Sequence, residues 1–241
     1  MRGPQSETGF NDWTECISVR FDFSFIAPEI GFLLQGAQLT IEVCFLALIG
    51  SLIMGSLVAI ARTSAARPLR VIAYAYVDLF RNIPFIVQLF FFYYGLPVIG
   101  IYLDAFPTGV VALSIAGGAF ASDVIRSGIL AIDPGIIEAA EVSGLSKRVI
   151  FTRIVLPIAL RTSIRPLGSV FINLILTSSI LSTITLNELT GSARIVVSDT
   201  FRPFEVYVVL LLVYAALTYL ISILIGVLHY RLNRNLGARV T

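Results

Sequence analysis

Few residues in this sequence have the chemical types that catalysis requires. It contains a single histidine, His229, and a single lysine, Lys147, which follows Leu145-Ser146. The chain therefore has no glycine-rich loop ending in Gly-Lys to hold nucleotide phosphates. Its serines have no histidine and carboxylate partners at the spacings of a hydrolase, and a metal site would lack ligands. We expect no catalytic residue, metal or other cofactor in this chain, so any nucleotide would bind a different protein.

One polar segment, residues 133–146, lies within an otherwise apolar sequence and contains the residues that begin and end a helix. Asp133 is a favourable N-cap, Pro134 suits the first helical position, and Gly144 suits the left-handed position just past the end. Ser146 can cap a second helix directly after it. A helix of about ten residues is too short to cross a bilayer. We interpret this segment as a docking site for another protein.

Polar side chains also interrupt the apolar stretches, where they are costly and usually face the interior of a helix bundle. Pro84 frees backbone carbonyls in the apolar stretch Leu69–Leu96, which could break into two half-helices at this proline and line a pathway. Asp78 and Arg81 are three residues apart and can form a purely structural ion pair instead, so both interpretations stay open. The candidate residues of a solute pathway are Asp78, Arg81, Asn82, Asn173, Thr177, Ser178 and Ser179. The serines and threonines among them have an alternative role, since such side chains often bond to their own backbone in membrane helices.

The composition indicates that these residues are held by membrane-spanning helices. Hydrophobic residues make up 57% of the chain and charged residues only 13%, and the mean hydropathy is +0.90. A hydrocarbon core is about 30 Å thick and needs roughly 20 apolar residues per helix. Stretches that satisfy this run over Gly31–Ala61, Leu69–Leu96, Pro107–Ile125, Pro166–Leu186 and Phe204–Leu228. The prediction is an all-α integral membrane protein with about five transmembrane helices, in which small residues around Gly55 and Gly117 allow close helix packing.

This pattern divides the chain into a polar N-terminal tail (residues 1–30), a transmembrane domain (residues 31–228) with a long polar loop at about 127–160, and a C-terminal tail (residues 229–241). Positively charged loops stay in the cytoplasm, which places the N-terminus outside and the C-terminus inside. The basic residues on the predicted cytoplasmic side are Arg62, Arg67, Arg70, Arg126, Lys147, Arg148, Arg153, Arg161, Arg165, Arg231, Arg234 and Arg239.

The polar loop resembles the cytoplasmic loop of ABC importer permeases, whose short helix docks on the ATPase subunit. The resemblance rests on Glu138-Ala139-Ala140, then Gly144-Leu145-Ser146, then Leu156-Pro157. It extends from about residue 21 to residue 236 and is similar to the polar amino acid permeases of the histidine and glutamine type. The further landmarks, in order, are Gly36 with Thr40, Phe80-Arg81 with Pro84, Val87-Gln88-Leu89-Phe90-Phe91, Ala119 with Asp123, Arg126, Gly128, Ile129, Ser179 and Glu188-Leu189.

The resemblance implies the type I ABC importer permease fold with a cytoplasmic coupling helix, in a bacterial inner membrane. It implies ATP-driven, binding-protein-dependent import of a polar amino acid or a related small polar solute by alternating access. The implied partners are two ATPase subunits carrying ATP and Mg, a second permease, and a soluble or lipid-anchored solute-binding protein. The residues that the resemblance assigns to ATPase coupling are Glu138, Ala139, Ala140, Gly144, Leu145 and Ser146. Glu138 would fix the loop by hydrogen bonds or by an ion pair to an arginine such as Arg148.

Two departures from the family pattern lie at positions where the family usually has a charged residue. Asp123 stands where a glutamate is usual, and Leu176 replaces a common lysine. The second departure raises the hypothesis of a heterodimer in which the other permease keeps the charge, although a homodimer also stays open.

Three other interpretations remain at the level of the sequence. The chain could be a self-sufficient secondary transporter or channel, or a structural or sensory membrane protein that recruits a partner. The helix at 134–143 could also lie on the membrane surface, although Glu138 and Glu141 argue against attraction to anionic lipid. The identity and charge of the solute stay open.

Overall fold

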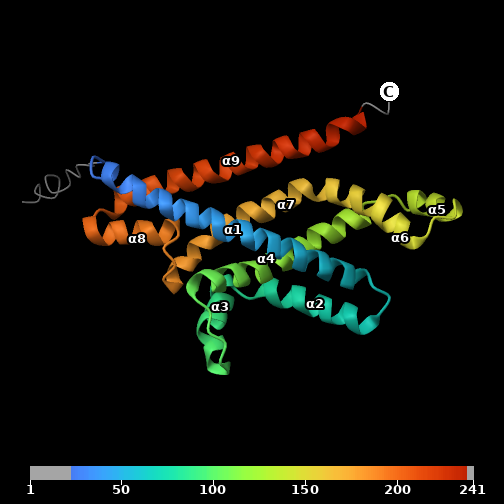
Figure 1. Ribbon diagram of the computed structural model, residues 1–241, viewed down its shortest axis with the longest axis horizontal. Helices are drawn as coiled ribbons and strands as arrows, with labels where there is room; N and C mark the ends of the chain where they lie inside the picture. Colours follow the sequence, from blue (N-terminus) through green and yellow to red (C-terminus); the bar gives the residue numbers. More distant parts are fainter. Residues whose placement is uncertain (1–22, 238–241) are drawn as a thin grey trace, which may run out of the picture.

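In the computed structural model, residues 23–237 are described, and their regular elements are all helices (Figure 1). The α-helices are α1 (Ile26–Thr63), α2 (Arg67–Asn82), α3 (Phe85–Phe90), α4 (Ala105–Leu130), α5 (Pro134–Val142), α6 (Lys147–Ile150), α7 (Leu156–Ser178), α8 (Leu189–Thr200) and α9 (Pro203–Gly237). Shorter segments extend some of them: the π-helices η1 (Phe91–Gly95) and η3 (Phe151–Val155) and the 3₁₀ helices η2 (Leu96–Ile99) and η4 (Ser179–Ile184).

Four continuous helical runs in the described residues are long and apolar enough to cross a membrane: Ile26–Thr63, Ala105–Leu130, Lys147–Ile184 and Pro203–Leu232. A fifth candidate is the pair Arg67–Asn82 and Phe85–Ile99, which is bent by 106°. The predicted all-α membrane fold with about five spans is therefore confirmed, with the second span as the irregular one.

The second span breaks at Ile83-Pro84, where the sequence predicts two half-helices. Ile83 has the extended backbone that a following proline favours, with φ of −90° and ψ of 131°. The buried Gln88 amide donates to the carbonyl oxygens of Phe80 (2.9 Å) and Ile83 (2.8 Å). A side chain thus satisfies the carbonyls that the break releases, as backbone at membrane depth requires.

Two features differ from the expectations. The apolar stretch Pro166–Leu186 covers only part of the fourth spanning helix, because α7 begins at Leu156 and continues through Pro166. The hydropathy criterion stops at Arg161 and Arg165, whereas the helical backbone does not. In addition, α8 forms between the fourth and fifth spans, outside the apolar stretches that predict the spanning helices.

Small residues bring α1 and α4 into close contact along much of their length (Figure 1). A Cβ atom on Gly55 of α1 would lie 2.7 Å from Ala121 Cβ and 3.0 Å from Ser122 N of α4. The helix α7 packs on the other side of this pair, where the buried Cys44 Sγ of α1 lies 3.6 Å from the Leu174 carbonyl oxygen. These three helices form the centre of the molecule.

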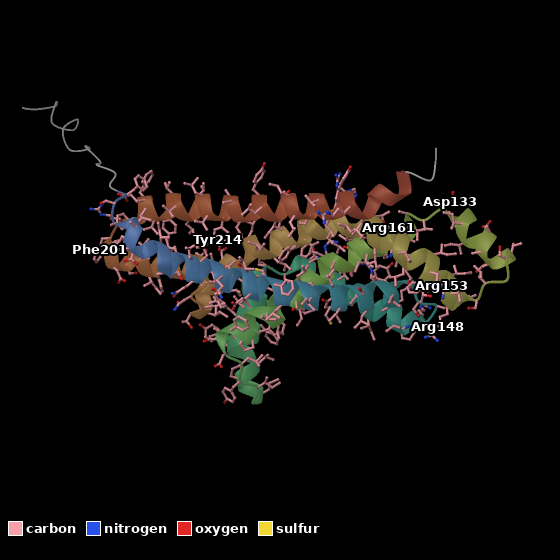
Figure 2. The ribbon with its side chains drawn as sticks, turned by 45° about the horizontal axis from the view of Figure 1, so that its top comes forward. Asp133, Arg148, Arg153, Arg161, Phe201 and Tyr214 are labelled. Atoms are coloured by element: carbon pink, nitrogen blue, oxygen red, sulfur yellow. The ribbon has the colours of Figure 1, made fainter. Side chains whose placement is uncertain are left out.

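The two ends of the bundle carry different elements. Figure 2 shows Asp133, Arg148 and Arg153 at one end and Phe201 at the other. The helices α5 and α6 and the last turns of α9 lie at the first end, and α8 and the start of α9 lie at the second (Figure 1). A short helical arm, α3 to η2, projects from the side of the bundle (Figure 1).

Candidate solute pathway and docking loop

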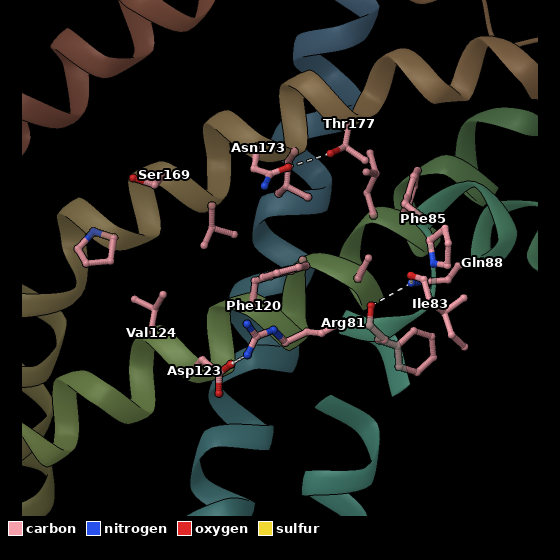
Figure 3. Close-up of a pocket in the computed structure, with 18 of the residues that line it drawn as sticks. Arg81, Ile83, Phe85, Gln88, Phe120, Asp123, Val124, Ser169, Asn173 and Thr177 are labelled. Atoms are coloured by element: carbon pink, nitrogen blue, oxygen red, sulfur yellow. Dashed lines mark hydrogen bonds and ion pairs between the residues drawn. The ribbon is translucent and has the colours of Figure 1, made fainter. Parts of the chain in front are cut away.

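A cavity of about 860 Å³ lies between α2–α3, α4 and α7 (Figure 3). This volume falls within the range of small-molecule sites in proteins. Most of its wall is apolar, including the aromatic rings of Phe80, Phe85 and Phe120. The polar residues that line it are Arg81, Gln88, Asp123, Arg165, Ser169, Asn173 and Thr177.

The helix α7 contributes a continuous polar stripe to the cavity. Arg165, Ser169, Asn173 and Thr177 follow one another at four-residue intervals, which places them on one face of the helix. Each step corresponds to about 6 Å along the helix axis. Thr177 donates a hydrogen bond from Oγ1 to Asn173 Oδ1 at 2.9 Å (Figure 3). The stripe could therefore guide a polar solute along roughly 18 Å of the helix.

The helix α4 contributes Asp123, whose carboxylate pairs with two arginines. One oxygen accepts from Arg62 of α1 and the other from Arg81 of α2. The Arg62 side chain is 8% exposed and lies over the Tyr74 ring at 4.6 Å, whereas the Arg81 side chain is 46% exposed. Asp123 thus joins α1, α2 and α4 at the edge of the cavity (Figure 3).

The structure brings together some of the predicted pathway residues and not others. Arg81, Asn173 and Thr177 line the cavity. The exposed Asp78 and Asn82 are not part of its lining, and Ser178 and Ser179 donate to the backbone carbonyls of Ile175 and Leu176.

The suggested pairing of Arg81 with Asp78 is not formed, because among the described residues Arg81 pairs with Asp123 instead. Sequence reasoning did not select Gln88, Asp123, Arg165 or Ser169 for the pathway. The four-residue spacing that ends at Asn173 and Thr177 is the signal that would have pointed to Arg165 and Ser169.

Residues 133–146, called the docking loop after the role that the sequence predicts for them, contain the expected helix caps. The Asp133 carboxylate accepts from the Gly135 N–H at 2.8 Å, and Ser146 Oγ accepts from the Val149 N–H at 3.4 Å. Gly144 has φ of +77°, and the Leu145 N–H donates to the Ala140 carbonyl at 3.2 Å. This arrangement ends α5 in the left-handed turn that glycine favours, as expected.

One face of α5 packs on the bundle and the other is open. Buried Ala140 joins a cluster with Ile150, Val155 and Ala159, at the start of the fourth span. The opposite face exposes Glu138, Ala139 and Val142, and Val142 is 90% exposed. The suggested ion pair of Glu138 with Arg148 is not formed among the described residues. The carboxylate of Glu138 is therefore exposed on the surface of the molecule.

Glu188 is a fully buried acid that stands at the N-terminus of α8. Its carboxylate accepts from the N–H groups of Thr190 (3.0 Å) and Gly191 (2.9 Å) and from the hydroxyls of Thr40 (3.4 Å) and Tyr214 (3.1 Å). Burial raises the pKa of the Glu188 carboxyl, and the hydrogen bonds from these donors oppose that rise. These contacts tie α8 to α1 and α9, which is a structural role.

Within residues 23–237, no three histidine, cysteine or carboxylate side chains come together in a way that could hold a metal ion.

Comparison with known proteins gives consistent matches. Residues 51–238 match the family described as "Binding-protein-dependent transport system inner membrane component". The chain is 37% identical over 212 residues to the probable glutamine ABC transporter permease protein GlnM of Bacillus subtilis (strain 168), covering 88% of this chain and 98% of that protein. It is 33% identical over 229 residues to the nopaline transport system permease protein NocM of Agrobacterium fabrum (strain C58 / ATCC 33970), covering 91% and 95%.

A solved structure described as "Crystal structure of an amino acid ABC transporter with histidines" is similar over 88% of this chain and 99% of that chain. The TM-score is 0.83 and the sequence identity is 32%.

Proposed function

The chain belongs to the family of inner membrane components of binding-protein-dependent transport systems, and on this premise we propose that it carries a polar amino acid or a related small polar solute. It is a permease subunit of an ABC importer and is not itself an enzyme. Support for an amino acid-like solute comes from relatives named for glutamine and nopaline transport. Family membership favours an importer subunit over a self-sufficient channel or a sensory protein.

One observation carries the proposed mechanism: the docking loop leads directly into the wall of the cavity. The helix α5 packs through Ala140 on Ile150 and Ala159, and the same chain continues through η3 into α7. The polar stripe of α7 lines the cavity. A displacement of α5 by a partner would therefore move a wall of the cavity, which is the linkage that alternating access needs.

We assign the exposed face of α5 to an ATPase subunit, with one such subunit on each permease of the pair and ATP and Mg bound there. The residues proposed to act in this coupling are Glu138, Ala139, Ala140, Gly144, Leu145 and Ser146. Within the described residues Glu138 has no cationic partner, so its carboxylate is available to a basic or hydrogen-bonding group of the ATPase. Ala140 faces inward and holds the helix on the bundle.

The proposed orientation places the α5–α6 end in the cytoplasm and the N-terminus outside. In support, Arg148 and Arg153 lie at that end (Figure 2), as the positive-inside rule requires. A solute-binding protein would then approach the opposite end, near α8. A second permease completes the transporter. Leu176, which is 52% exposed, stands where the family often has a lysine, and the partner could be either a second copy of this chain or a different permease that keeps the lysine.

The first test of this function is purification of the chain from a mild detergent extract of its native membrane, followed by mass spectrometry and an ATPase assay. We expect an ATPase to co-purify with the native chain. Gly144→Ala forces a side chain into the left-handed turn at a cost of about 1–2 kcal/mol, and we expect it to reduce the bound ATPase or uncouple its activity severalfold. Glu138→Ala should weaken binding without affecting the fold.

Gly100→Ala is the matched control for this experiment. Gly100 also has a positive φ, of +86°, and a Cβ atom at either glycine would have nothing within 4 Å. The two substitutions therefore impose similar backbone strain, but only one of them lies in the docking loop. Equal loss of ATPase in both variants, or no ATPase with the native chain, would overturn the assignment of α5.

A further inference from the structure

The cavity carries more positive than negative charge. Two arginines, Arg81 and Arg165, line it, and Asp123 is the only acidic residue among the described residues of its wall. The two arginines and the one aspartate give the lining a formal charge of +1. Both arginines are exposed, so water partly screens this excess, and the mostly apolar wall beside them limits that screening for a solute held against it.

The carboxylate of Asp123 is already engaged. It accepts from the buried Arg62, which stands behind the cavity wall, and from Arg81. A cationic solute would have to displace an arginine to reach it. Among the described residues, the cavity wall therefore offers a cationic solute no unpaired carboxylate.

Arg165 has no such engagement. No acidic side chain of residues 23–232 lies within ion-pair distance of its guanidinium, and the residue is exposed. It begins the polar stripe of α7, ahead of Ser169 and Asn173. The Arg165 guanidinium can donate two hydrogen bonds to one carboxylate in a bidentate pair. The hydroxyl and amide groups farther along the stripe supply additional donors.

We propose that the cavity selects solutes with net negative charge, in the form of small amino acids whose carboxylates outnumber their ammonium groups, and that Arg165 binds one of those carboxylates. A solute of charge −1 neutralises the +1 lining, a zwitterion leaves it unchanged, and a cation increases it. This inference rests on the proposed function, because it takes the cavity as the place where the solute binds.

The test measures binding to the permease without the solute-binding protein, whose own selectivity would hide that of the cavity. The complex of the chain with its co-purifying partners is reconstituted in lipid nanodiscs, and radiolabelled L-glutamate, L-glutamine and L-arginine are the probes. We expect L-glutamate to bind at least ten times more tightly than L-arginine, with L-glutamine between them.

Three variants of α7 test the role of Arg165. Arg165→Gln should weaken L-glutamate binding about tenfold, and Arg165→Lys should restore most of it. Arg165→Glu should reverse the order and favour L-arginine. Arg161→Gln is the matched control, since Arg161 lies one helical turn earlier and does not line the cavity, and this change should leave the order as in the native chain.

Binding of L-arginine as tight as that of L-glutamate, absence of L-glutamate binding at millimolar concentration, or an unchanged order in Arg165→Glu would overturn the inference. The proposed function fails separately. A complex that retains ATPase coupled to its docking loop but shows no charge order disproves only the selectivity. A complex without an ATPase disproves the importer mechanism.

Discussion

At the scale of single residues, Asp123 is the carboxylate that pairs with two arginines, Arg62 and Arg81. Asp123→Asn removes the charge that pairs with Arg62, whose side chain is only 8% exposed. An uncompensated buried charge costs about 3 kcal/mol. We expect the variant to unfold several degrees below the native chain. Thermal unfolding of the two purified proteins in detergent would measure the difference.

Asp78→Asn is the control for that prediction. Asp78 is exposed on α2 and forms no ion pair among the described residues, so its replacement should change the free energy of unfolding by less than about 0.5 kcal/mol. If the two variants lose equal stability, the ion pairs of Asp123 do not hold α1, α2 and α4 together.

The ion pair of Asp123 with Arg81 could not be predicted from residues close in sequence. Asp78 and Arg81 are close in sequence, and helical spacing permits them to pair. Arg81 instead pairs with Asp123, which is 42 residues away and is brought near by the packing of α2 on α4. By contrast, Asp133, Gly144 and Ser146 act within a few residues of their own positions, and their predicted capping roles are confirmed.

At the scale of elements, the contact of α1 with α4 depends on the absence of side chains. In Gly55→Val, the added Cβ would come within 3.0 Å of the backbone nitrogen of Ser122, which cannot move aside easily. We expect a loss of stability of at least about 2 kcal/mol, since overpacking a close helix contact costs about 1–3 kcal/mol. Thermal unfolding in detergent would measure it.

Gly31→Val on the same helix provides the comparison. A Cβ atom at Gly31 has nothing within 4 Å, so this variant should unfold close to the native temperature. Similar losses at the two positions would show that helix propensity, rather than the contact between α1 and α4, sets the cost.

The anchoring of α8 gives a second prediction at this scale. Glu188→Ala leaves the N–H groups of Thr190 and Gly191 without their acceptor, and each such group costs about 1–3 kcal/mol. Glu188→Gln keeps one acceptor oxygen and should lose less than half as much. Both would be compared by thermal unfolding, and a Gln variant as unstable as the Ala variant would contradict this account.

Most elements could be predicted, because long apolar stretches and helix caps are local signals. The five spans, the break at Pro84 and the short helix α5 are examples. The helix α8 was not predicted, since its formation depends on tertiary contacts such as Tyr214 on Glu188. The start of α7 was missed because Arg161 and Arg165 lowered the hydropathy of a segment that remains helical.

At the scale of the whole molecule, the docking loop and the cavity are joined by a short stretch of chain: α5 is followed by a turn at residues 143–146, and α6, η3 and α7 then run on without a break to the cavity wall. The identity of the family could be predicted from the ordered motifs. The lining of the cavity could not, because it combines faces of α2, α3, α4 and α7 whose relative rotation depends on packing.

The burial of Cys44 allows thiol labelling to report whether α1 and α7 separate during transport. Its thiol lies sealed between α1 and the Leu174 carbonyl of α7, and a thiol reacts only where a reagent can reach it. In a Cys16→Ser background, maleimide should label the resting transporter slowly and the ATP-hydrolysing one several times faster, as α7 separates from α1. A labelling rate that turnover leaves unchanged would mean that α1 and α7 travel together as one rigid body, with the opening elsewhere.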